Sequence, residues 1–251
     1  MDEPVYLSKS GQIAVITLNQ PAKKNAISAA MMDILVDTLR RCDVDDEVRV
    51  IILRGEGENF SAGGDLDQKV PGADTVEGKC AILQHYLWAV QALREVGKPV
   101  IAMADGYVVG GAFSLLLACD LVVVSDRVKV VPAFISIGII PEMGLMKLLP
   151  AAVGEKLAKE ILFLNKRLGS EDLLRLGIAN RVFPANELAA RTEDFARELA
   201  AQPNLSIQLS KRIMNAASDV GLDQVMRAEA TSSPLCSLSA EFAEVARRFA
   251  K

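Results

Sequence analysis

Two glycine-rich stretches, each directly after an apolar run, constrain the fold of this 251-residue chain more than any other feature. The first is FSAGGDL at residues 60–66, and it follows the apolar run at 48–53. The second is GYVVGGAFS at residues 106–114, and it follows the apolar run at 100–104. Short apolar runs broken by glycine are typical of buried strands. The pattern therefore predicts two strands that each end in a loop with bare backbone.

Loops of small residues leave their backbone N–H groups open to a ligand, because no side chain stands in the way. Two such loops can converge as a pair of amide donors on one oxygen atom, which is the design of an oxyanion hole. For either loop alone, an ordinary tight turn would be the favoured interpretation. Because both follow apolar strands, we predict a site that binds a polarised oxygen.

The order of the remaining elements predicts an α/β protein. Strands alternate with helices over the first two thirds of the chain, and helices dominate from residue 155 onward. Ser28 is suited to cap a helix whose apolar stripe includes Met31, Leu35 and Leu39. Further strands are expected at 5–7, 13–17, 121–124 and 128–131, and a further amphipathic helix at 78–95.

Composition excludes several classes of partner. Hydrophobic residues make up 51% of the chain and the net charge is −4, so a sizeable core is expected and nucleic acid is not the expected partner. The four cysteines share no metal-like spacing and are expected to be buried small hydrophobes in a reducing compartment. With no signal peptide and no apolar run of transmembrane length, the sequence predicts a cytoplasmic protein without membrane contact.

Familiar catalytic motifs do not fit. The stretch at 55–60 begins like a dinucleotide-binding loop, but the third glycine is missing and two glutamates would repel a pyrophosphate. A serine hydrolase needs a general base, and the only histidine, His85, lies in an apolar helix where a packed or hydrogen-bonded role is favoured. One histidine and scattered cysteines also argue against a zinc site.

Glu142 is the most informative carboxylate. It stands alone among Ile137, Ile139, Ile140, Met143 and Leu145. Buried there, it would have a raised pKa and would serve as a proton-transfer base. The alternative is a glutamate at the start of a helix, favoured by the helix dipole, and spacing alone does not decide between the two.

The segment at 67–77 carries a proline, a glycine and mixed charges, which predicts a mobile surface loop that acts as a lid. We expect this loop and the helix at 78–95 to shape a substrate pocket.

Taken together, the motifs resemble the enoyl-CoA hydratase/isomerase (crotonase) superfamily. The resemblance rests on FSAGGDL at 60–66, ADGYVVGG at 104–111, ACDL at 118–121 and IGIIPEMG at 137–144 with the LLP that follows. It covers nearly the whole chain, and the order of these motifs is specific for the superfamily but much less so for the reaction.

The resemblance implies repeated ββα units at residues 1–190 that bind acyl-CoA, and a helical oligomerisation module at 191–251. It implies an acyl-CoA thioester as substrate, as in fatty acid metabolism, with no metal and no redox cofactor. The expected assembly is a homotrimer or a hexamer built as a dimer of trimers. By position, the oxyanion-hole amides are those of Gly64 and Gly111. The residues expected to contact the substrate or its CoA part are Lys24, Ala26, Ala62, Asp65, Leu66, Phe134 and Ile137.

Departures from the superfamily's pattern indicate the reaction. Hydratases of the superfamily use two glutamates to activate water, and the matching positions here are Ser114 and Phe134, neither of which is an acid. The Pro141-Glu142-x-Gly144 arrangement instead resembles the Δ3,Δ2-enoyl-CoA isomerase branch, in which an acidic residue moves the proton. We therefore expect an isomerase. The alternatives are a hydratase or another lyase of the family, and a catalytically silent acyl-CoA-binding or scaffold member.

The chemistry needs one base and a dry pocket. Removing the α-proton of a thioester places negative charge on the thioester oxygen, and two amides stabilise that enolate. A single carboxylate can take the proton from C2 and return it at C4. We expect Phe134, Ile137 and Ile140 to keep water away from the enolate.

Overall fold

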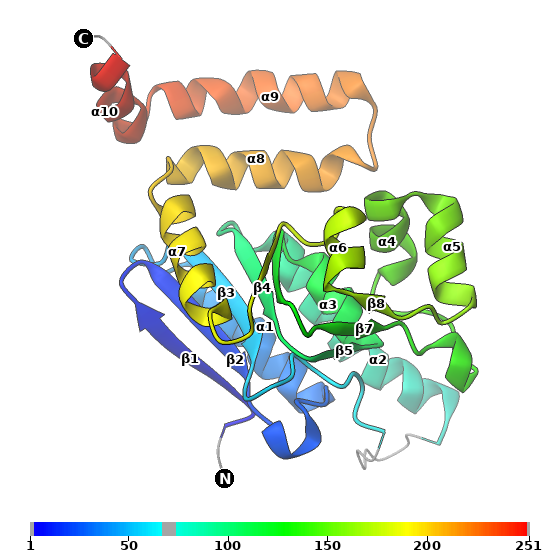
Figure 1. Cartoon of the computed structure of the whole chain (residues 1–251). Helices are drawn as coiled ribbons and strands as arrows, with labels where there is room; N and C mark the ends of the chain where they lie inside the picture. The colour runs from blue at the N-terminus through cyan, green and yellow to red at the C-terminus, as the bar shows by residue number, and fades with distance from the viewer. Residues whose placement is uncertain (1–2, 67–73, 250–251) are drawn as a thin grey trace.

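The computed structural model describes residues 3–66 and 74–249, which form two β-sheets surrounded by helices (Figure 1). The main sheet has the strand order β1-β2-β3-β4-β6-β9, in which β1 and β2 are antiparallel and all other neighbours are parallel. The second sheet has the order β5-β7-β8. The strands are β1 (Val5–Ser10), β2 (Ile13–Leu18), β3 (Val50–Gly55), β4 (Val100–Ala104), β5 (Tyr107–Val109), β6 (Leu121–Ser125), β7 (Lys129–Val131), β8 (Leu168–Gly169) and β9 (Arg181–Phe183).

Helices connect the strands and then dominate the C-terminal part of the chain. The first of them begins where the sequence predicts, because the Ser28 hydroxyl accepts the Met31 N–H at 3.2 Å. The helices are α1 (Ala29–Asp43), α2 (Val76–Glu95), α3 (Gly111–Ala118), α4 (Leu145–Val153), α5 (Glu155–Phe163), α6 (Ser170–Arg175), α7 (Leu188–Ala200), α8 (Asn204–Ala217), α9 (Leu222–Ser237) and α10 (Ala240–Phe249), with 3-10 turns η1 (Pro21–Lys23) and η2 (Ile135–Ile137).

Successive parts of the chain repeat one route: a main-sheet strand, a short extended segment in a second layer, and a helix. In the third and fourth units the extended segments are β5 and β7, which pair in parallel. In the first two units they are shorter, and the isolated bridges Ile27–Gly64 and Ser61–Val108 join them to the same layer. The α/β fold of repeated ββα units is therefore confirmed.

Both faces of the main sheet are covered. On β4, Val100, Ala102 and Ala104 belong to the core cluster that contains α1, α2 and α3, whereas Ile101 and Met103 pack toward α7. Parallel strands buried on both faces lose the alternation of polar and apolar residues. This explains why the strands before the glycine-rich stretches read as continuous apolar runs.

Three features of the chain differ from the sequence-based expectations. The second glycine-rich stretch contains a strand, β5, and two short strands, β8 and β9, interrupt the part predicted to be helical. A strand of two or three residues is too short to produce a periodic pattern. The expected loop at 67–77 falls largely on residues 67–73, which lie outside the described residues, and α2 already begins at Val76.

The last helices, α8 to α10, extend from one end of the molecule (Figure 1). Lys211 joins α8 to the core: its buried Nζ lies 2.7 Å from Asp120 Oδ2 and donates to the carbonyls of Leu93 and Lys98. The predicted boundary after residue 190 falls inside α7, which lies on the main sheet, so the division into two domains stays a prediction. Among the described residues, no helix has the length and apolar character needed to cross a membrane.

Candidate active site

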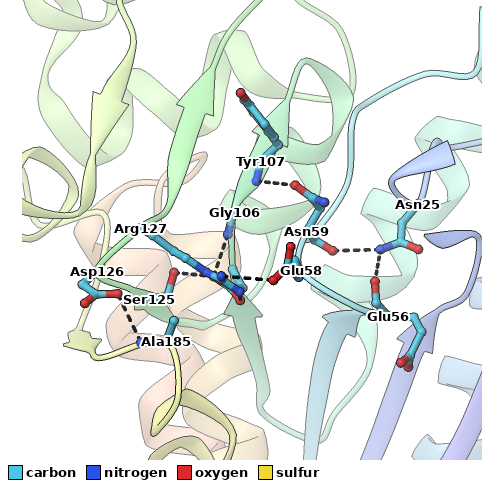
Figure 2. Close-up of polar contacts among 11 residues, drawn as sticks. Asn25, Glu56, Glu58, Asn59, Gly106, Tyr107, Ser125, Asp126, Arg127 and Ala185 are labelled. Atoms are coloured by element: carbon cyan, nitrogen blue, oxygen red, sulfur yellow. Dashed lines mark hydrogen bonds and ion pairs between the residues drawn. The ribbon is translucent and has the colours of Figure 1, made fainter. Parts of the chain in front are cut away.

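The side chain of Asn25 holds the loop that leads from β3 into the first glycine-rich stretch (Figure 2). Its amide nitrogen donates to the carbonyls of Glu56 and Asn59 at 2.9 and 2.8 Å, and its oxygen accepts the Gln20 N–H at 3.0 Å. Asn25 is fully buried and has a φ of +57°, a left-handed conformation in which asparagine is enriched. The chain folds so closely here that a Cβ on Gly55 would stand 2.1 Å from the Asn59 carbonyl oxygen.

Ser61 links this anchor to the glycines. Its buried hydroxyl donates to the Asn25 carbonyl at 2.7 Å and accepts the Gly63 N–H at 3.1 Å. Gly63 has a φ of +85°, and a Cβ there would stand 2.6 Å from the carbonyl oxygen of Val109. Only glycine fits at this position. The close approach places the first glycine-rich loop directly against the second.

The amide of Gly64 is left open. Ile27 donates its N–H to the Gly63 carbonyl at 2.7 Å and accepts the Asp65 N–H at 2.8 Å. In such a parallel bridge the bonds go to the residues on either side, so the N–H of Gly64 itself points away from Ile27. Over residues 3–66 and 74–249, the Gly64 N–H has no hydrogen-bond partner, and a Cβ on Gly64 would meet nothing within 4 Å.

The second amide of interest is at the start of α3. Gly110 turns the chain with a φ of +53° and donates its N–H to the Val131 carbonyl at 2.9 Å. Gly111 is the first residue of the helix, where a backbone N–H has no carbonyl one turn earlier to bind. The positive end of the helix dipole adds to the attraction of this amide for a negative oxygen.

Ile27 and Met143 bring the two loops and a third segment together. The Ile27 side chain lies 3.9 Å from the Cβ position of Gly111, and the same residue forms the bridge with Gly64. The sulfur of Met143 lies only 2.7 Å from that Cβ position, so a side chain on Gly111 would require the Met143 side chain to move. Both glycine-rich loops and the turn that contains Glu142 therefore meet at one place.

Glu142 lies in a tight turn that precedes α4. Its carbonyl accepts the Leu145 N–H at 3.1 Å and the Ser114 hydroxyl at 3.0 Å. Both central residues of the turn have positive φ, +58° at Met143 and +77° at Gly144, as in a type I′ turn. Since Ser114 lies in α3, this hydrogen bond attaches the Glu142 turn to the helix that begins with Gly111.

The two interpretations of Glu142 can now be separated. Glu142 precedes the N-cap Gly144, so it is not in the first turn of α4. A helix N-terminus would lower the pKa of a carboxyl group, whereas burial raises the pKa of Glu142 above its ordinary value. The direction of the shift is that of a partly desolvated carboxyl group, and its role as a base stays a prediction.

Two lysines lie at an exposed tyrosine next to the first loop. The ammonium groups of Lys24 and Lys129 lie 5.1 and 5.7 Å from the centre of the Tyr107 ring. Asp65 belongs to the first glycine-rich loop, and its carboxylate Oδ2 lies 2.8 Å from the Nζ of Lys23. Lys129 lies in β7, and its position beside Lys24 was not predicted. No local sequence pattern connects it to Lys24, which is more than one hundred positions earlier in the chain.

The other predicted contact residues differ in exposure. Ala26 and Phe134 are buried, and the Phe134 ring lies 3.9 Å from the Cβ position of Gly110. Ala62 is half-buried and donates its N–H to the Lys24 carbonyl. At 85% exposed, the Leu66 side chain is open to solvent.

Of the three residues expected to form a dry lining, one is buried and two are exposed among the described residues. Phe134 is buried, but Ile137 and Ile140 are 57% and 67% exposed. Residues 135–137 form a 3-10 turn on the surface, and the lining of a dry pocket by these three side chains stays a prediction.

An ion pair that was not predicted, between Arg127 and Asp105, lies next to the start of the second glycine-rich loop. Arg127 binds Asp105 through Nε at 2.9 Å and Nη2 at 2.6 Å, and Ser125 donates to the same carboxylate at 2.6 Å. Burial acts to raise the pKa of Asp105, but these hydrogen bonds outweigh it and the pKa lies below its ordinary value. Asn59 accepts the Tyr107 N–H at 3.1 Å and so ties the two loops together (Figure 2).

A surface cavity of about 640 Å³ lies on the outer side of this ion pair. None of the predicted site residues lines it; its lining residues are Asp126, Arg127, Ala185 and Asn186. Within the described part of the chain, no group of three or more histidine, cysteine or acidic side chains is arranged to hold a metal ion.

The remaining candidate groups lie outside the site. His85 is hydrogen-bonded, as predicted, with its Nδ1 2.6 Å from Asp33 of α1. Cys42 and Cys119 are buried, and burial raises the pKa of the Cys42 thiol to about 11. Cys80 is exposed on α2, so the expectation that all four cysteines are buried was wrong. Its place on the outer face of an amphipathic helix explains the difference.

Comparisons with known proteins identify the family of the chain and proteins of similar fold. A family model described as enoyl-CoA hydratase/isomerase matches residues 8–250. The chain is 35% identical to 4-chlorobenzoyl coenzyme A dehalogenase-2 from Arthrobacter over 87% of this chain and 80% of that protein. It is 33% identical to carnitinyl-CoA dehydratase from Escherichia coli over 90% of this chain and 86% of that protein. The crystal structure of an enoyl-CoA hydratase from Polaromonas sp. JS666 superposes with a TM-score of 0.93 at 26% identity, covering 98% and 96% of the two chains.

Proposed function

Because this chain belongs to the enoyl-CoA hydratase/isomerase family, we propose that it is a Δ3→Δ2 enoyl-CoA isomerase in which Glu142 is the only base. The family makes it an acyl-CoA enzyme. The finer assignment rests on one observation: Glu142 is the acidic residue whose backbone is bonded, through Ser114, to the helix that begins with Gly111. The two positions where hydratases of the family are expected to have glutamates hold a serine bonded to the Glu142 carbonyl and a buried phenylalanine.

In the proposed mechanism, the thioester carbonyl accepts the N–H groups of Gly64 and Gly111. Glu142 takes a proton from C2, and the electron pair moves onto the thioester oxygen. Each amide donor stabilises that oxyanion by roughly 3 kcal/mol, judged from related sites. Glu142 then returns the proton at C4, and the double bond moves into conjugation with the carbonyl. The raised pKa of Glu142 suits this role, because a stronger base accepts the proton more readily and a neutral acid can return it.

We propose that the CoA part lies along the first loop. Lys24 approaches the CoA phosphates beside Lys129, while Ala26, Ala62, Asp65 and Leu66 line the pantetheine and adenine. The Asp65 carboxylate is paired with Lys23, so Asp65 contributes its backbone rather than its charge. Phe134 and Ile137 contact the acyl chain.

An assay with paired substrates tests the proposed reaction. Wild type should convert a 3-enoyl-CoA to the 2-enoyl-CoA, and Glu142→Gln should abolish the conversion while still binding acyl-CoA. Glu155→Gln is the matched control, because Glu155 is an exposed carboxylate at the start of α5. Rapid hydration of a 2-enoyl-CoA by wild type and Glu142→Gln alike would assign a hydratase or another lyase. Binding without turnover of either substrate would assign a silent member.

Dehalogenation of an aryl-CoA is a second candidate, favoured by the 35% identity to the Arthrobacter dehalogenase. A carboxylate could attack the ring carbon that bears chlorine, with the ring electrons moving onto the thioester oxygen held by the same two amides. Chloride then leaves, and water hydrolyses the aryl ester on the carboxylate. Release of chloride from 4-chlorobenzoyl-CoA by wild type but not by Glu142→Gln would select this reaction over isomerisation.

We also propose that three copies assemble through the C-terminal helices, as a trimer or as a hexamer of two trimers. This is supported by apolar side chains that α8 to α10 leave exposed in a single chain. They are Met214, Leu222, Met226, Leu235, Leu238 and Phe242.

A further inference from the structure

Ser114 occupies a place in the site that the proposed mechanism does not use. The residue is fully buried in α3, and its hydroxyl donates to the Glu142 carbonyl at 3.0 Å. The only histidine of the chain, His85, is bound to Asp33, and the proton of the Ser114 hydroxyl is already committed. Ser114 is therefore not equipped to act as a nucleophile or as a proton donor.

The turn that Ser114 holds is unfavourable on its own. Met143 has a φ of +58°, which a residue with a side chain rarely adopts, and such conformations persist only where surrounding contacts enforce them. Three contacts do so here. The carbonyl of Glu142 accepts both Ser114 and Leu145, and the Met143 side chain, 3% exposed, packs its sulfur against Gly111.

One short helix thereby carries both halves of the proposed chemistry. Gly111 is the first residue of α3 and Ser114 the fourth, so they lie on the same side of the helix, one turn apart. In the proposed mechanism the N–H of Gly111 binds the thioester oxygen, while the Ser114 hydroxyl holds the Glu142 carbonyl. The spacing between the oxyanion donor and the base is set through a rigid element rather than through a free loop.

We propose that Ser114 is a positioning residue that sets the distance of the Glu142 carboxylate from the Gly111 amide. The proposal rests on the proposed role of Glu142. It gives a function to the position at which the family's hydratases carry a glutamate: the hydroxyl supports the remaining carboxylate instead of supplying a second one.

The test compares Ser114→Ala with Ser114→Cys and with Thr38→Val. Thr38 is also buried and donates its hydroxyl to a backbone carbonyl, that of Ile34 at 2.7 Å, but it does so within α1 and away from the site. Ser114→Ala should lower kcat by about 10- to 100-fold, since misplacement by about 1 Å can cost about 100-fold. The Kd of a non-reactive acyl-CoA analogue should change little. Ser114→Cys, which keeps a weak donor, should recover part of kcat.

A pH profile separates positioning from loss of stability. Ser114→Ala should shift the midpoint of the kcat profile to lower pH, because a loosened turn admits water to Glu142 and reduces the desolvation that raises its pKa. Thr38→Val should leave both kcat and the midpoint unchanged.

The proposal is overturned if Ser114→Ala keeps kcat and the pH midpoint at the level of Thr38→Val while Glu142→Gln is inactive. Full activity of Glu142→Gln would instead overturn the proposed function itself. If wild type proves to release chloride from 4-chlorobenzoyl-CoA, the same variants are compared on that reaction, because the position of Glu142 matters equally there.

Discussion

At the scale of single residues, the neighbouring glycines 63 and 64 serve opposite purposes. Gly63 is needed for the fold, because its φ is +85° and a Cβ would overlap the Val109 carbonyl. Gly64 has open space around its Cβ position, so no contact among residues 3–66 and 74–249 requires a glycine there. Under the proposed mechanism, a glycine is needed at position 64 because the thioester approaches its amide.

The two alanine variants should therefore fail in different ways. Gly63→Ala should lose at least about 3 kcal/mol of stability, from backbone strain and overlap combined. Gly64→Ala should keep the melting temperature of wild type but lower kcat/KM at least about tenfold, because the methyl group displaces the thioester. Thermal melts and steady-state kinetics on both variants check this. A Gly64→Ala enzyme with normal kinetics would show that the Gly64 amide binds no substrate.

Glu142 should reduce the stability of the folded protein at neutral pH. Burial raises its pKa in the folded chain, so the folded protein holds this proton more tightly than the unfolded chain does. The stability that protonated Glu142 contributes is present below the pKa of glutamate in the unfolded chain, about 4.3. It is lost as the pH rises from that value through the higher pKa of Glu142 in the folded chain. Glu142→Gln should therefore melt at a higher temperature than wild type at pH 7–8, and the difference should shrink toward pH 4.

Glu155→Gln is a control, because the pKa of Glu155 is shifted in the opposite direction to that of Glu142. The hydrogen bond from Lys159 lowers the pKa of Glu155, so its ionised form favours folding above the unfolded pKa. Replacement of Glu155 should leave stability at neutral pH unchanged or slightly lower. Equal melting curves for wild type and Glu142→Gln at every pH would contradict a desolvated Glu142.

At the scale of elements, the sequence predicts what local patterns determine. The cap at Ser28 and the stripe of Met31, Leu35 and Leu39 suffice to place α1. Strands β3 and β4 follow from apolar runs that end in glycine. The short strand β9 has no such signal, because its place at the sheet edge depends on pairing with β6.

At the candidate site, too, some features follow from local sequence patterns and others only from contacts between distant residues. Gly64, Gly111 and Glu142 are predicted as site residues from motifs in which neighbouring residues carry the information. The Ser114–Glu142 and Asp105–Arg127 contacts join residues 28 and 22 positions apart, and only the folded chain brings them together. The exposure of Ile137 likewise depends on a turn whose direction the apolar pattern does not contain.

One buried ion pair, between Lys211 and Asp120, attaches helix α8 to the core. Lys211→Met should lower the free energy of unfolding by about 3–5 kcal/mol, because the largely buried Asp120 carboxylate loses its positively charged partner. Hydrogen exchange should then rise first in α8 and α9. Lys211→Met with Asp120→Asn should recover part of the loss, and Lys159→Met, at an exposed ion pair, should have no effect. Uniform loss of protection over the whole chain would contradict a local role.

At the scale of the whole molecule, the exposed apolar surface of the C-terminal helices predicts assembly. Light scattering on wild type should give a mass three or six times that of one chain. Leu238→Asp with Leu222→Asp should lower the mass to that of one chain while circular dichroism stays unchanged, because both side chains are more than 70% exposed in the single chain. A wild type that is monomeric at every concentration tested would contradict the proposed assembly.

The central claim is that a single carboxylate, at residue 142, carries a hydrogen from C2 to C4 while two amides hold the thioester oxygen. The most direct measurement uses a 3-enoyl-CoA that carries deuterium at both C2 positions and follows the product by NMR. We expect deuterium at C4 of the 2-enoyl-CoA product, diluted by exchange with water, and no such product from Glu142→Gln. Product formation by Glu142→Gln at the wild-type rate, or product that is only the 3-hydroxyacyl-CoA, would contradict it.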